Sequence, residues 1–331
     1  MVVAGRPEGA EILSRPFPGA GLRFGGGSAA CMGRIFLLLI VLGLVANQGF
    51  AQAKPGSEPC TAPHLEHTLA IAGYVVKTFE PAREDGQACL LILRSGRIVF
   101  RLADESSYAI GQAADEADGI PAIKPGADLS GNGKPDLIVQ SSTGGAHCCY
   151  TVRVVELGSK LRVLDKYDAE DGDLSHFLYD QDGHKYVFTA ADWSFAYWHT
   201  SFAQSPAPKV VLNVSGNDAD PAHLAVELMR QPLPASTELD AQSRAVQGTF
   251  EQADSDAIPQ SPELWTTMLT LIYTGHADAA WQFLDGAWPA GNPHKEAFLG
   301  AFCEKLSGSP YWGDLKKMMK TAPSGCIAFS E

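Results

Sequence analysis

The sequence predicts an α+β fold in which an antiparallel β-rich half is followed by a helical half. From about residue 68 to 214, short segments rich in Val, Ile and Leu alternate with Gly, Asp, Ser and Asn. After residue 217, apolar residues recur at helical spacing instead. We therefore expect a propeller-blade-like or sandwich-like arrangement of strands, followed by helices that pack against it.

The individual elements follow from these patterns. Ser95-Gly96 is expected to be a hairpin turn, and Pro262 and Pro293 stand just inside the starts of two helices, as helix capping favours. The expected strands are 69–76, 89–93, 98–102, 137–139, 150–155, 161–164, 186–189 and 209–212. The expected helices are 222–229, 262–273, 278–284 and 294–306.

The amino-terminal segment predicts export. An apolar run at 35–46 follows Arg34, and the small residues Ala51-Gln52-Ala53 come soon after. This is the layout of a secretory signal peptide, and the run is shorter than the roughly 20 apolar residues of a membrane span. We expect a leader and signal peptide at 1–53, a β-rich domain with a cation loop at 54–215, and an α-helical domain at 216–331. The mature protein is expected to be periplasmic or secreted, without stable membrane insertion.

The charge balance narrows the class of partner. The chain has a formal net charge of −13, and removal of the four Arg and two Glu of the leader changes it to −15. An acidic chain repels the phosphates of nucleic acids and of anionic membranes. We therefore expect no nucleic-acid partner, and the expected partner is a protein or a carbohydrate.

The cysteine count predicts disulfides. Of seven cysteines, Cys31 lies in the leader, and an even number remains: Cys60, Cys89, Cys148, Cys149, Cys303 and Cys326. In an exported chain these predict a disulfide framework with 15 possible connectivities. We expect Cys303 to pair with Cys326 because the two close a short loop in the last segment. The other four are expected to crosslink the amino-terminal half.

Two of these cysteines are adjacent, in the stretch Gly144-Gly-Ala-His-Cys-Cys149. Successive residues of a strand point to opposite faces, so adjacent half-cystines either bond to different partners or form a vicinal bridge. Redox chemistry, or zinc binding together with His147, is the alternative. We favour the structural disulfides.

The stretch D-L-S-G-N-G-K-P-D at 128–136 predicts a cation-binding loop. Oxygen-bearing side chains occupy alternate positions, glycines permit the tight bends, and an apolar strand follows directly. Hard cations such as Ca²⁺ bind several oxygen ligands in such loops. The expected ligands are the side chains of Asp128, Ser130, Asn132 and Asp136 and the backbone carbonyl of Lys134.

This loop resembles the repeat loop of the FG-GAP/VCBS family, D-x-N-x-D-G-x-x-D-L followed by apolar residues, which occurs in integrin-like and bacterial secreted β-propellers. The resemblance implies Ca²⁺ held between the strands of a blade, and it covers about a dozen residues. Ser130 and Asn132 are neutral where the family has Asn or Asp more often, so two carboxylates remain. A metal-free Asp/Asn/Gly turn is the alternative.

A second stretch at 179–187 is similar to a degenerate copy of the same loop. Asp180 and Asp182 occupy the first two ligand positions, but no later carboxylate appears before Tyr186. A hairpin turn at Asp182-Gly183 explains the stretch equally well. A full second cation site is therefore not expected.

An aromatic stretch follows at 192–200. If it is a strand, Trp193, Phe195 and Tyr197 share one face. Such a face could bind carbohydrate or peptide, but we expect these residues to pack between the β half and the helical half.

The sequence favours a binding or structural module over an enzyme. It contains no G-x-S-x-G elbow, no H-E-x-x-H, no P-loop and no dinucleotide fingerprint. The leading hypothesis is an exported, disulfide-stabilised module with a Ca²⁺-binding loop. The alternative is an extracytoplasmic hydrolase whose dispersed acidic and histidine residues meet only in the fold, which predicts a deep pocket uniting Asp192 with His147 or His176.

Overall fold

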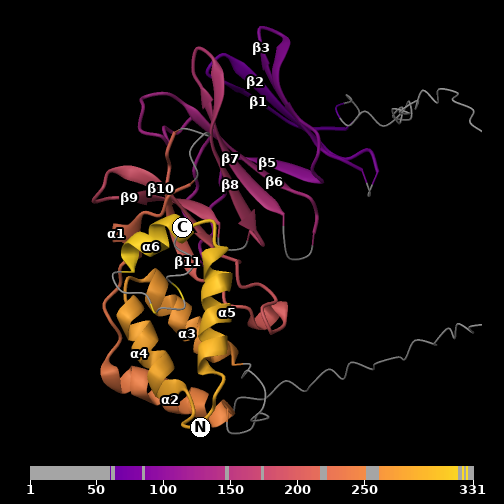
Figure 1. Cartoon of the computed structure of the whole chain (residues 1–331). Coiled ribbons are helices and arrows are strands. Elements are labelled where there is room, and N and C mark those ends of the chain that lie inside the picture. The colour runs from indigo at the N-terminus through magenta and orange to yellow at the C-terminus, as the bar shows by residue number, and fades with distance from the viewer. Residues whose placement is uncertain are drawn as a thin grey trace, which may run out of the picture. The chain divides into compact units, whose positions relative to one another are not determined.

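The expected α+β class is confirmed in the described part of the chain. The expected leader, 1–53, lies outside the described residues, which all belong to one unit, Ala53–Glu331. Eleven antiparallel strands in three sheets precede the main helices (Figure 1). The computed structural model describes residues 60, 64–83, 86–145, 149–172, 175–216, 222–250, 261–319, 323 and 326.

The first sheet is an antiparallel meander of four strands, β1 (Leu65–Ile71), β2 (Tyr74–Phe79), β3 (Cys89–Arg94) and β4 (Arg97–Leu102). The hairpin at Ser95-Gly96 is confirmed: both residues have positive φ, 52° and 74°, as a two-residue turn of this kind requires. The expected strand at 69–76 is wrong, because Ala72-Gly73 form a second such turn, with φ of 49° and 78°.

The second and third sheets are also meanders. The second contains β5 (Ser107–Ile110), β6 (Asp136–Ser142), β7 (Tyr150–Leu157) and β8 (Leu161–Glu170). The third contains β9 (His176–Asp180), β10 (Lys185–Ala191) and β11 (Lys209–Asn213), with β10 in the centre. Neighbouring strands are antiparallel throughout.

The second sheet is the middle layer of a stack, since both of its faces are buried. Leu137 and Val139 of β6 pack with Val76 and Ile92 of the first sheet. Ile138, which points the other way, belongs to a larger core that also contains the third sheet and the helices. This explains why residues 137–139 of β6 are apolar at three successive positions: a strand segment covered on both faces has no polar side to present.

The helical half begins after β11. Its helices are α1 (Val226–Met229), α2 (Ser236–Phe250), α3 (Pro262–Tyr273), α4 (Ala277–Ala287), α5 (Lys295–Ser307) and α6 (Trp312–Met318). The predicted bounds of α3 are confirmed, whereas the helix expected at 222–229 is reduced to the four residues of α1. Gly275, with φ of 88°, ends α3 in the left-handed conformation that glycine adopts without strain. No helix among the described residues is long and apolar enough to span a bilayer.

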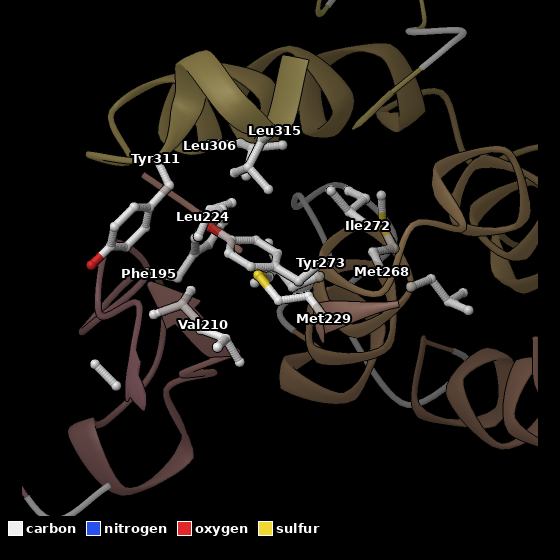
Figure 2. Close-up of a cluster of buried hydrophobic side chains, with 14 of the residues drawn as sticks. Phe195, Val210, Leu224, Met229, Met268, Ile272, Tyr273, Leu306, Tyr311 and Leu315 are labelled. Carbon is white, nitrogen blue, oxygen red and sulfur yellow. The ribbon is translucent and has the colours of Figure 1, made fainter. Parts of the chain in front are cut away.

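One core joins the two halves. Phe195 and Val210 from the β half meet Tyr273 and Leu315 from the helices (Figure 2). The aromatic stretch at 192–200 contributes to this core, although not as a strand: it forms turns, so Phe195 is buried while Tyr197 is 62% exposed. The expected packing role therefore holds for Phe195, and the expected shared strand face is wrong.

The disulfides crosslink both ends of the described chain. Cys303 pairs with Cys326, as predicted, with Cα atoms 4.9 Å apart. Cys60 pairs with Cys89, with Cα atoms 5.3 Å apart, and ties the start of the described chain to β3. Cys149 is also disulfide-bonded, while His147 and Cys148 lie outside the described residues.

A buried carboxylate fastens the third sheet to the helices. Asp192, only 3% exposed, directly follows β10, and its Oδ2 accepts hydrogen bonds of 2.5 Å from the hydroxyls of Tyr273 and Ser309. Its Oδ1 accepts hydrogen bonds from the backbone and the hydroxyl of Ser194. Burial, and the charge of Asp192, raise the pKa of Tyr273 well above its ordinary value, so that its phenol remains a donor.

Replacement of Asp192 by alanine is expected to leave the hydroxyls of Tyr273 and Ser309 without their acceptor in a buried site. We predict a loss of about 2–4 kcal/mol in the free energy of unfolding, measured by denaturant titration. Asp182→Ala, in an exposed turn, is the control and should change stability by less than about 0.5 kcal/mol. Equal unfolding midpoints for the two variants would contradict a fastening role for Asp192.

Candidate functional site

The predicted cation loop connects to the first residue of β6 and closes on itself through the backbone. The amide of Asp136 donates to the carbonyl of Ala127 at 3.0 Å, and the amide of Gly126 donates to the carbonyl of Asp136 at 2.8 Å. Between these points Gly131 and Gly133 have φ of 69° and 79°, a region that favours glycine. The alternating glycines thus permit the tight bends that the sequence pattern predicted.

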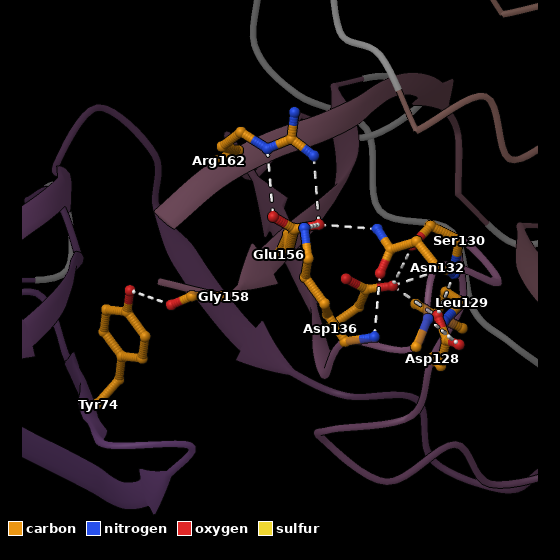
Figure 3. Close-up of polar contacts among 11 residues, drawn as sticks. Tyr74, Asp128, Leu129, Ser130, Asn132, Asp136, Glu156, Gly158 and Arg162 are labelled. Carbon is orange, nitrogen blue, oxygen red and sulfur yellow. Dashed lines mark hydrogen bonds and ion pairs between the residues drawn. The ribbon is translucent and has the colours of Figure 1, made fainter. Parts of the chain in front are cut away.

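The structure brings all the predicted ligands into one loop (Figure 3). The carboxylate of Asp128 accepts the amides of Asn132 at 3.0 Å and Gly133 at 2.8 Å, and the side-chain oxygen of Asn132 accepts the amide of Lys134 at 3.0 Å. Each of these oxygens keeps a further lone pair, because carboxylate and amide oxygens accept more than one bond. Among the described residues, nothing donates a hydrogen bond to the carbonyl of Lys134.

Asp136 is the most buried member of the set. It is 1% exposed, and its Oδ2 accepts three hydrogen bonds, from the amides of Leu129 and Ser130 and from the Ser130 hydroxyl, at 2.9–3.0 Å. Its Oδ1 is also buried and has no partner in the described structure. Burial raises the pKa of Asp136 above its ordinary value, and the hydrogen bonds from Ser130 and Leu129 oppose this only in part.

Glu156 faces Asp136 across the β6–β7 ladder, and sequence reasoning missed it. Glu156 is 2% exposed and is the residue paired with Asp136. Its carboxylate accepts hydrogen bonds from Asn132 at 2.7 Å, from the ammonium of Lys134 at 2.9 Å, and from Arg162 at 3.2 Å through two nitrogens. The hydrogen bonds from Arg162 dominate and, with those from Lys134 and Asn132, lower the pKa of Glu156 to about 2 despite its burial.

The two facing carboxylates are therefore neutralised unequally. Glu156 forms ion pairs with both nearby basic side chains, Lys134 and Arg162, each about half exposed. Asp136 has only neutral donors and one oxygen without a partner. Because Asp136 Oδ1 is buried without a hydrogen-bond donor, Asp136 is the position in this loop where a cation or a proton would lower the cost of burial.

The loop residues fit a hard cation better than a transition metal. Their donors are oxygens of carboxylates, an amide, a hydroxyl and a backbone carbonyl, the set that Ca²⁺ binds. In the described ranges, no group of three or more His, Cys, Asp or Glu side chains could hold a metal ion. A site in this loop would thus depend on its neutral oxygens as well as on Asp128 and Asp136.

The second stretch forms a hairpin turn. Lys185 pairs with Asp180 across β9 and β10, and the four residues 181–184 connect the strands. The Asp180 carboxylate accepts the amide of Asp182 at 3.2 Å, which is ordinary turn chemistry. Of the two carboxylates predicted for a possible second site, Asp180 thus ends β9 and is half-buried, and Asp182 lies in the exposed turn.

Of the three residues named for a hydrolase, the structure describes Asp192 and His176. The carboxylate of Asp192 is buried beneath Tyr273 and Ser309 and serves the junction between the halves. His176 starts β9, where its backbone carbonyl accepts a hydrogen bond from Thr189. His147 lies outside the described residues.

No family model, curated protein or solved structure matches the chain. The resemblance of the loop at 128–136 to the FG-GAP/VCBS repeat therefore rests on its own residues and stays a prediction. Its geometry is a separate observation: a closed oxygen-rich loop around a buried carboxylate at the start of a strand.

Glu156→Gln is expected to destabilise the loop, because the amide cannot balance the charges of Lys134 and Arg162. We predict a loss of about 1–2 kcal/mol in the free energy of unfolding at neutral pH, since both cations are partly hydrated. The pKa of Glu156 is lowered from 4.5 to about 2, so its contribution is complete above pH 4.5 and disappears as the pH falls toward 2.

Denaturant titrations at several pH values measure this effect. The difference in free energy of unfolding between wild type and Glu156→Gln should become smaller as the pH falls below 4.5. The control variant Glu304→Gln, at an exposed position, should be as stable as the wild type at every pH. A constant difference from pH 7 to pH 3 would argue against a charge-based role for Glu156.

Proposed function

We propose that the protein is an exported, disulfide-stabilised binding or structural module whose second sheet is fastened by Ca²⁺ in the loop 128–136. The observation that carries the proposal is Asp136 Oδ1, a buried carboxylate oxygen without a partner among the described residues. No cationic side chain donates a hydrogen bond to the Asp136 carboxylate within the described structure, whereas two, Lys134 and Arg162, donate to the facing Glu156.

A bound cation offsets the free-energy cost of burying the Asp136 carboxylate more completely than a proton does. A proton on Oδ1 neutralises Asp136 but leaves a buried hydroxyl that needs an acceptor. A cation coordinated by Oδ1 supplies the missing charge and also uses the remaining lone pairs of Asp128, Ser130 and Asn132. The Ser130 hydroxyl donates its hydrogen to Asp136, so its lone pairs remain available.

The donor set supports calcium and a weak site. Ca²⁺ accepts neutral and charged oxygens in flexible geometry, whereas Mg²⁺ demands near-octahedral coordination and keeps several waters. Two carboxylates give a low charge count, which corresponds to the micromolar to millimolar range of Ca²⁺ sites. Such affinity suits the millimolar calcium of the extracellular medium.

Export is supported by the disulfides. Cys60–Cys89, Cys303–Cys326 and the bonded Cys149 are typical of chains that fold in an oxidising compartment. Together with the signal-peptide pattern, they support a periplasmic or secreted protein. The acidic chain then meets protein or carbohydrate partners rather than nucleic acid.

Calcium is expected to raise the melting temperature of the oxidised mature chain. At a concentration 100-fold above Kd, binding contributes about 2.7 kcal/mol, or about 5 °C for a chain of this size. Thermal melts with chelator and with millimolar Ca²⁺ measure the shift. Asp136→Asn and Asp128→Asn should each reduce it strongly, and Asp182→Asn, in the hairpin turn, should retain it.

Two outcomes would contradict the calcium site. The first is an unchanged wild-type melting temperature in millimolar Ca²⁺. The second is an undiminished calcium shift in both Asp136→Asn and Asp128→Asn, which places the ion elsewhere. Mg²⁺ at equal concentration is the matched ion control and should give a smaller shift.

Export is tested separately. Residues 1–53 fused to a reporter that is active only outside the cytoplasm should direct its secretion in a bacterial host, and the mature chain should begin near Lys54 by amino-terminal sequencing. A reporter without activity, or an uncleaved leader, would contradict this part of the proposal.

A further inference from the structure

The first sheet ends in an open edge strand, β4. In the order β1-β2-β3-β4 this strand pairs with β3 on one side only. Within the described chain, no residue outside this ladder makes a hydrogen bond to the backbone of residues 97–102. Because a strand directs its amides and carbonyls to both sides, β4 presents a row of unpaired backbone donors and acceptors.

The apolar side chains at this edge are exposed. Ile98 is 57% exposed and Val99 46%. Ile98 lies directly across from Leu93, which lies across from Val75, so the three form one apolar row over β4, β3 and β2. Ile92, next to Leu93, packs in the core shared with the second sheet, so the row faces the opposite side. The row ends at the open edge, where a further strand would extend it.

The strands of this sheet are basic, although the chain as a whole is acidic. The full sequence has 38 acidic and 25 basic residues, not counting histidine. The four strands contain one acid and four basic residues: Glu66, Lys77, Arg94, Arg97 and Arg101. A local excess of positive charge attracts an acidic partner and repels a basic one.

The two arginines of β4 are not used within the described structure. Arg97 and Arg101 are exposed, and neither makes an ion pair or a side-chain hydrogen bond with any residue. Arg94 of β3 differs, because its guanidinium donates to the hydroxyl of Tyr74 and to the carbonyl of Ser159. Since a guanidinium matches a carboxylate in geometry and charge, β4 offers two unused positions for Asp or Glu side chains.

The same charges disfavour a second copy of β4 as the occupant of this edge. Two β4 strands paired antiparallel over their full length would place Arg97 of each copy opposite Arg101 of the other. Like charges directly opposite in a sheet are destabilising. The edge is thus protected against pairing with itself, while an acidic strand meets no such repulsion.

From the open edge of β4, its two exposed apolar side chains and its two unused arginines, we propose that the first sheet binds an extended acidic segment of another protein. The segment adds as a strand beside β4 and pairs with its backbone. Its apolar side chains continue the row that ends at Ile98, and its carboxylates pair with Arg97 and Arg101. This inference names a partner class for the binding role proposed above and rests on it, but it does not depend on the cation loop.

An array of terminally blocked octapeptides tests the proposal. The peptides alternate Val and Thr and have two Asp or Glu residues placed at every combination of positions. We expect at least one acidic peptide to bind the oxidised mature chain, with its affinity measured by fluorescence anisotropy. The same peptide with Lys in place of its acids should not bind. Methylation of alternate backbone amides, which retains every side chain but blocks strand pairing, should also abolish binding.

Charge reversal on the protein tests the position of the site. Arg97→Glu and Arg101→Glu should each weaken binding at least about fivefold, since each variant loses an ion pair and introduces a like charge. Arg244→Glu, at an exposed position of α2, is the matched control and should bind the peptide as the wild type does. Each variant is also melted with and without Ca²⁺, and a retained calcium shift shows that the loop 128–136 is intact.

Four outcomes would overturn the proposal. The first is an array without any acidic hit, and the second is a hit that both Arg97→Glu and Arg101→Glu retain. The third is binding of vesicles that contain phosphatidylserine in place of any peptide, which would assign the basic strands to a membrane surface. The fourth is a dimer in place of peptide binding, which would make a second copy the occupant. Because binding is measured both in chelator and in Ca²⁺, each of these results is separate from failure of the calcium site.

Discussion

Two buried carboxylates facing each other at one end of the β6–β7 ladder determine how the surrounding loop folds. Like charges directly opposite in a sheet are unfavourable, and both Asp136 and Glu156 are almost fully buried. The loop before β6 meets this constraint by directing amides and a hydroxyl at Asp136, while its Asn132 and Lys134 reach across to Glu156. The spacing of polar residues in the loop is thus a consequence of the charges it must surround.

Buried acids that accept several hydrogen bonds also occur at the junction between the sheets and the helices. Asp192 is a buried acid at a strand end whose oxygens accept hydrogen bonds from the hydroxyls of Tyr273, at the end of α3, and Ser309, between α5 and α6. Asp314 of α6 behaves similarly. Burial raises its pKa, but hydrogen bonds from Lys317, from the amide of Leu224 and from His223 outweigh burial and lower the pKa of Asp314 below its ordinary value. Buried acids with satisfied oxygens therefore hold separate layers together, whereas Asp136 and Glu105 each have one buried carboxylate oxygen without a partner among the described residues.

The parts of this structure that sequence reasoning predicted are those with local signals. Helix α3 has a proline in its first turn and a strong apolar face. The loop 128–136 has oxygen-bearing side chains at alternate positions. Helix α2 was missed because it buries only Val246 and Phe250, too few to mark a helical face. Glu156 was missed because its role depends on Asp136 and Lys134, 20 or more residues earlier. Its one local signal is that it is the single acid in the strand sequence Y-T-V-R-V-V-E-L.

The burial of β6 on both faces has a consequence for the whole stack. Leu137 and Val139 serve one core while Ile138 serves the other, so a shift of this strand by one residue would exchange its contributions to two cores at once. The closed loop pins Asp136, the first residue of β6, to Ala127 and Gly126. An ion held at this point would set the alignment of β6, and with it the contacts that this one strand makes in both cores.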